Sequence, residues 1–153
     1  MLLAAAEAGD VAQLRRALVE SGDRLGVNSP DDQGRTALLQ AASAGHVDAV
    51  RVLLTEGGAR VGDTNAKGTT ALLMAAKGGH LPLVQYLLQV AGARVDEANG
   101  RGTTAVLWAA MKGHVEVVRY LVQEGGAEVD GADPVGWTPL LYGTTHPTRP
   151  HPP

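Results

Sequence analysis

The sequence predicts an all-α solenoid, in which short antiparallel helix pairs stack in a row and β-turn or hairpin loops project from them. The main observation is a threonine that recurs every 34 residues, at Thr36, Thr70, Thr104 and Thr138. Two more markers keep this spacing: a Gly-His pair starting at Gly45, Gly79 and Gly113, and an apolar run starting at Val50, Val84 and Val118. Three markers in register indicate a repeat array, whose units are stabilised by stacking on their neighbours.

The composition fits such an array and excludes several classes of function. Of the 153 residues, 44% are hydrophobic but only 3% are aromatic, so the core must consist of Ala, Leu and Val in closely packed elements. The absence of Cys excludes disulfides, Cys-ligated zinc, iron–sulfur clusters and thiol catalysis. A net charge of −3 argues against a dedicated nucleic-acid binder, and no apolar run approaches the ~20 residues that span a bilayer. We expect an intracellular monomer, cytoplasmic or nuclear, without membrane insertion.

Each repeat reads as two short helices followed by a turn. The first helix of a full unit is predicted from Thr36, whose hydroxyl can accept a hydrogen bond from the first turn, through Leu38 to Ala44, and it stops at Gly45. The paired alanines next to its end (Ala41-Ala42, Ala75-Ala76 and Ala109-Ala110) allow neighbouring helices to approach closely.

The second helix of the same unit is predicted from the spacing of its apolar residues, which are Val47, Val50, Leu53 and Leu54. This spacing places them on one helical face. We expect this helix to end at Gly57-Gly58, and the polar segment 61–68 that follows to form a turn or short hairpin.

These motifs closely resemble those of the ankyrin repeat family. The family's Thr-Pro-Leu-His motif corresponds to four segments here, which begin at Thr36, Thr70, Thr104 and Thr138. Its Ala-Ala-x-x-Gly-His motif corresponds to segments 41–46, 75–80 and 109–114. The departures are a period of 34 residues where the family has 33, and Leu in place of the motif His.

The resemblance predicts an ankyrin repeat domain over residues 1–142 and a Pro-rich, disordered tail over 143–153. The predicted units are about 1–33, 34–67, 68–101 and 102–135, with a partial fifth unit over 136–142. The first unit aligns Met1 with Ala37, so it lacks the turn and the Thr cap, and its link over 22–27 carries two extra residues.

No set of residues in the sequence predicts catalysis, a cofactor or a metal site. His46, His80 and His114 each start a second helix, where an imidazole can bond local backbone, and they recur too far apart to share one metal. The acidic residues of the turns, such as Asp31 and Asp63, are spread one or two to a repeat, which indicates a solvated edge rather than a calcium loop. We therefore expect that the protein is not an enzyme.

The resemblance implies a partner-binding face made by the turn tips and the first helices. We select nine candidate contacts on this face: Arg35, Lys67, Thr69, Lys77, Arg101, Thr103, Met111, Lys112 and Trp137. Because five of them are basic, we expect a partner segment that carries acidic residues. The alternative is that these Lys and Arg side chains only solubilise an exposed surface. Met74, Trp108 and Tyr142 also recur at repeat spacing, which favours packing between repeats, with Trp108 as the exception because of its size.

We expect the function of a non-enzymatic protein–protein interaction scaffold, which binds a partner segment through the concave groove formed by the turn tips and first helices. The alternative is a regulatory or targeting ankyrin fragment of a larger multidomain protein, whose other domains could be enzymatic. The abrupt start at Met1 and the incomplete fifth unit favour that alternative.

Overall fold

Four helix pairs form the part of the chain that the computed structural model describes, which is residues 1–21, 24–129, 136 and 138. The first helices of the pairs are α1 (Leu2–Ala8), α4 (Ala37–Ala44), α6 (Ala71–Gly78) and α8 (Ala105–Lys112). The second helices are α2 (Val11–Ser21), α5 (Val47–Thr55), α7 (Leu81–Gln89) and α9 (Val115–Gln123). A ninth short helix, α3 (Arg24–Asn28), follows the first pair. The predicted all-α solenoid is confirmed.

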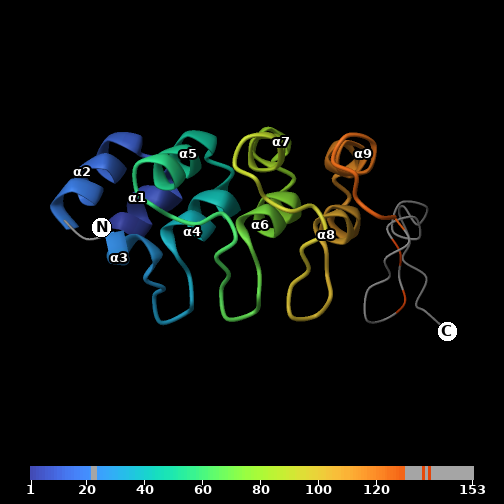
Figure 1. Cartoon of the computed structure of the whole chain (residues 1–153), viewed down its shortest axis with the longest axis horizontal. Coiled ribbons are helices and arrows are strands. Elements are labelled where there is room, and N and C mark those ends of the chain that lie inside the picture. The colour runs from blue at the N-terminus through green and yellow to red at the C-terminus, as the bar shows by residue number, and fades with distance from the viewer. Residues whose placement is uncertain (22–23, 130–135, 137, 139–153) are drawn as a thin grey trace.

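The helices form two rows, and the turns project from one side (Figure 1). In the lower row each first helix packs against the first helix of the next repeat, from α1 through α4 and α6 to α8. The second helices form the upper row, in which α5 contacts both α2 and α7, and α7 contacts α9. Successive turns therefore lie beside one another below the first helices.

The ends of the first helices follow from local sequence. Thr36 lies in extended backbone and its Oγ1 accepts a hydrogen bond from the Leu39 N–H at 3.3 Å, and Thr70 and Thr104 cap α6 and α8 in the same way. Gly45 ends α4 in the left-handed region at φ 78°, where a side chain would be strained. The predicted start and end of this helix are confirmed. The first unit has no such start, because Met1 makes no side-chain capping bond to α1.

Alanine and leucine side chains build the core between the two rows. Ala41, Ala42, Ala75 and Ala76 are fully buried, so backbones of neighbouring first helices approach closely. The largest fully buried side chains are Leu and Val residues, among them Leu38, Leu72 and Leu107. This explains how the array is packed without Phe.

Two boundaries differ from those predicted. The link after α2 contains α3, in which Val27 is 2% exposed and joins the core, so the two extra residues are used to form a helical turn. Helix α5 ends at Thr55, before Gly57, because the N–H groups of Glu56 and Gly57 both bond the Val52 carbonyl and the helix closes there.

The predicted partial fifth unit and the tail over 143–153 fall almost wholly outside the described residues, as does Tyr142. Within the described ranges, no helix is long and apolar enough to cross a lipid bilayer.

Candidate partner-binding face

Each of the three described turns is held together by one side chain, that of Asp31, Asn65 or Asn99. The Oδ1 atom of Asn65 accepts hydrogen bonds from the N–H groups of Lys67 at 2.9 Å and Thr69 at 3.1 Å. Asn99 does the same for Arg101 at 2.9 Å and Thr103 at 3.0 Å. These bonds fix the backbone on which the candidate contacts Lys67 and Arg101 stand.

Asp31 holds the equivalent place in the first described turn, where its Oδ1 accepts from the N–H groups of Gln33 and Arg35, each at 2.9 Å. The Asp31 carboxylate is still partly exposed at this edge, and it also organises the turn, which was not predicted from the sequence. The signal was present in the sequence, since Asp31, Asn65 and Asn99 each precede a turn glycine by three residues and recur every 34 residues.

Neighbouring turns are also bonded to each other. The Gly100 N–H donates to the Lys67 carbonyl at 3.0 Å, which joins the turn before α6 to the turn before α8. A Cβ at Gly68, whose φ is +70°, would lie only 3.0 Å from the Gly100 nitrogen. The tips therefore approach closely at glycine, and the backbone that carries Lys67 and Arg101 is held together.

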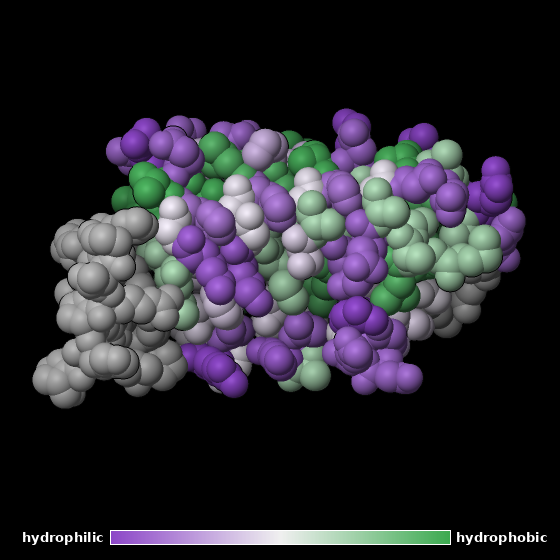
Figure 2. Space-filling view, turned by 180° about the vertical axis from the view of Figure 1, so that it is seen from behind, coloured by the Kyte–Doolittle hydropathy of each residue, from purple (hydrophilic) through white to green (hydrophobic). Residues whose placement is uncertain are grey.

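A concavity of about 200 Å³ lies between these two turns and the first helices above them. Eight residues line it: Asn65, Lys67, Thr69, Met74, Lys77, Asn99, Arg101 and Trp108. Four of the nine candidate contacts thus come together here, namely Lys67, Thr69, Lys77 and Arg101. The lining carries three cations and no carboxylate. Hydrophilic residues also dominate the tips of the turns when the molecule is seen from behind (Figure 2).

Trp108 forms part of this concavity and of the packing between repeats. Its half-buried ring contacts the core, and the Lys77 ammonium from the preceding repeat lies 4.9 Å from the ring centroid. This is within the range of a cation–π interaction. The indole Nε1 is buried and has no hydrogen-bond partner. Sequence reasoning identified Trp108 as an exception to simple packing but did not place it among the candidate contacts.

Arg35 lies apart from the concavity lining and is engaged within its own turn. Its guanidinium forms an ion pair with Asp31 at 2.6 Å. The side-chain hydrogen bond from Arg35 holds the pKa of the Asp31 carboxyl below its ordinary range. The charge of Arg35 is therefore largely balanced inside the turn, and its role in partner binding stays a prediction.

Of the other four candidates, three do not line the concavity and one lies outside the described residues. Thr103 is only 7% exposed, which leaves little of it available for contact. Met111 is half-buried and Lys112 is exposed at the end of α8, and neither lines the concavity. Trp137 lies outside the described residues. The role of all four in binding stays a prediction.

The periodic histidines are structural, but they do not bond local backbone as predicted. The Nε2 atoms of His46, His80 and His114 lie 3.0, 3.0 and 2.9 Å from carbonyl oxygens of Glu7, Ser43 and Lys77. Each partner belongs to the first helix of the preceding repeat. Stacking brings these groups together, and spacing within one repeat cannot reveal them.

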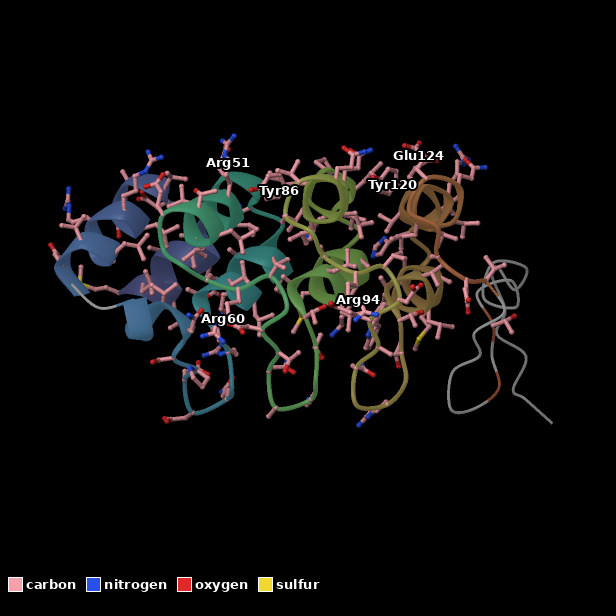
Figure 3. The ribbon with its side chains drawn as sticks, in the orientation of Figure 1. Arg51, Arg60, Tyr86, Arg94, Tyr120 and Glu124 are labelled. Atoms are coloured by element: carbon pink, nitrogen blue, oxygen red, sulfur yellow. The ribbon has the colours of Figure 1, made fainter. Side chains whose placement is uncertain are left out.

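The second helices present a surface of mixed charge. Arg15 of α2 pairs with Glu56 after α5 at 2.7 Å, Arg119 pairs with Glu116 at 3.3 Å, and Arg51 pairs with Asp48. Figure 3 shows Arg51, Tyr86, Tyr120 and Glu124 along the row of second helices, and Arg60 and Arg94 lower, beside the first helices. Exposed pairs of this kind contribute little to stability.

Comparison with known families agrees with this geometry. A family model described as ankyrin repeats (3 copies) matches residues 1–99 and 89–148. No curated protein sequence matches the chain significantly. The resemblance drawn from the motifs is thereby confirmed.

Proposed function

Since this chain belongs to the ankyrin repeat family, whose domains are generally non-catalytic modules for protein–protein interaction, we propose that it binds a polypeptide segment of a partner along the face made by its turns and first helices. The segment lies across successive turn tips, because a solenoid presents the same surface at every repeat and so offers one continuous groove.

The observation that carries this proposal is the concavity between the second and third described turns. Lys67, Lys77 and Arg101 converge on it while no acidic side chain lines it. On the second helices, by contrast, Arg15, Arg51 and Arg119 are each paired with a carboxylate. A cluster of unbalanced cations in a protein of net charge −3 favours an acidic partner segment.

Charge reversal tests the proposal. A variant with Lys67→Glu, Arg101→Glu and Lys112→Glu together should lose proteins that the unmodified chain captures from an extract, identified by mass spectrometry. The matched control reverses three exposed charges of the second helices, Arg16→Glu, Arg51→Glu and Arg119→Glu, and should keep them. Binding through the groove would be contradicted if the first variant still captured these proteins, or if both variants lost them equally.

A further inference from the structure

We infer that the concavity between the turns of Asn65 and Asn99 is a subsite for one side-chain carboxylate of the bound segment, and that it sets the register of that segment along the groove. This inference rests on the proposed function. It adds a particular chemical group at a particular place to the general expectation of an acidic partner.

The size of the concavity selects a single side chain. Its volume is about 200 Å³, below the roughly 300–1,000 Å³ of sites that enclose a drug-sized molecule. The turns before α6 and α8 bound it, one on each side, so a segment that places one residue here lies across both turns. An internal Asp or Glu fits this arrangement, whereas a chain end would leave half of the groove unused.

The lining supplies a complete set of groups for a carboxylate on an apolar stem. Lys67 and Arg101 stand on adjacent turn tips, which are joined by the bond from the Gly100 N–H to the Lys67 carbonyl. Lys77 adds a third cation, held over the Trp108 ring. Met74 and Trp108 provide apolar surface for the stem. Hydrogen bonds between such cations and a carboxylate are stronger than those between neutral groups.

The preceding interval of the array lacks this set, which is why the subsite can fix register. One repeat earlier, Ser43 replaces Lys77, Met74 replaces Trp108, and Gln33 replaces Lys67. The basic residues at that interval are Arg35, which is paired with Asp31, and Lys67 itself, which stands where Arg101 stands one repeat later. A segment with one carboxylate therefore gains most when that group lies between the turns of Asn65 and Asn99 rather than one repeat earlier.

The unpaired Trp108 N–H provides a built-in reporter. Nε1 has no acceptor in the described structure, so its indole N–H signal in a nitrogen–proton NMR spectrum should shift when an anion displaces Lys77 or approaches the ring. The chain has two Trp residues, so Trp137→Phe assigns the two indole signals.

The probe is a short capped peptide of Gly and Ser with a central Leu-Glu-Leu, added to the full chain labelled with nitrogen-15. We expect a saturable shift of the Trp108 signal with a dissociation constant on the order of 1 mM. The same peptide with Gln in place of Glu should bind about tenfold more weakly, as should the Glu peptide to Arg101→Gln or Lys67→Gln. Arg51→Gln, on a second helix, is the matched control and should bind as the unmodified chain does.

Three outcomes would overturn the inference. The first is equal binding of the Glu and Gln peptides, or unchanged affinity in Arg101→Gln and Lys67→Gln. The second is binding of a phosphoserine peptide without binding of the Glu peptide, which would identify a phosphate site. The third is binding of the Gln peptide only when it ends in a free carboxylate. If partner capture still depends on the groove charges in any of these cases, the subsite fails while the proposed function stands.

Discussion

The imidazole of His80 lies directly against Gly45, the glycine that ends the first helix one repeat earlier. A Cβ added to Gly45 would lie 2.4 Å from His80 Nδ1, while the ring's Nε2 bonds the Ser43 carbonyl at 3.0 Å. The same relationship joins Gly9 to His46 and Gly79 to His114. The Gly-His motif therefore connects repeats: its glycine makes room for the next histidine, and its histidine bonds the repeat before.

Gly45→Ala should destabilise the protein strongly, for two reasons that add. A side chain at φ 78° costs roughly 1–2 kcal/mol, and displacement of the His80 ring costs about 1–3 kcal/mol more. Urea denaturation followed by circular dichroism gives the free energy of unfolding of this variant and of the control below.

Gly113→Ala is the control, because Gly113 has a similar φ of 76° but no described atom within 4 Å of the added Cβ. It should lose only the backbone contribution. Equal losses in the two variants would show that the contact with His80 contributes nothing to stability.

Asn65→Ala should loosen the turn that carries Lys67. Removing Oδ1 leaves the N–H groups of Lys67 and Thr69 without their acceptor, and Thr69 is mostly buried, so we expect a loss of about 1–3 kcal/mol. Faster hydrogen exchange at these two amides would locate the effect. Asn65→Asp keeps the acceptor, as Asp31 does in its own turn, and should retain slow exchange. Similar exchange rates in both variants would contradict this role.

The exposed Arg15–Glu56 pair should give a weak, acid-sensitive link between the first two repeats. The side-chain hydrogen bond from Arg15 lowers the pKa of the Glu56 carboxyl. A carboxyl with a lowered pKa in the folded state stabilises that state above its unfolded pKa, about 4.3, and this contribution is lost as the pH falls through the folded pKa. NMR titration should find Glu56 below the ordinary Glu range, and Arg15→Gln should restore it. An unchanged Glu56 titration in that variant would exclude the pair.

The first helices and their ends could be predicted because their causes are local. Thr36 caps the helix that it precedes, and Gly45 ends it in a conformation that glycine adopts readily, so both effects act within a few residues. The short helix Arg24–Asn28 was missed because two extra residues can be accommodated by many loop conformations. Burial of Val27 in the core selects one of them, and burial depends on the whole array.

The candidate face could be predicted only in outline, since contacts across repeats depend on how repeats stack. Lys67, Lys77 and Arg101 were found from their places in the motif, and they do line one concavity. The pairing of Arg35 with Asp31, and the position of the Lys77 ammonium over Trp108, depend on side-chain geometry that spacing does not determine. The Asp31, Asn65 and Asn99 series was visible in the sequence, but the turn bonds were not predicted from it.

Site-specific photocrosslinking tests the central claim most directly, namely that the turns and first helices bind the partner. A photoreactive amino acid is placed at position 67 or 112 on this face, and at position 51 or 119 on the second helices, and partner adducts are compared after irradiation in cells. The account predicts adducts from positions 67 and 112 and none above background from 51 and 119. Adducts that form only from the second helices, or equally from both faces, would contradict it.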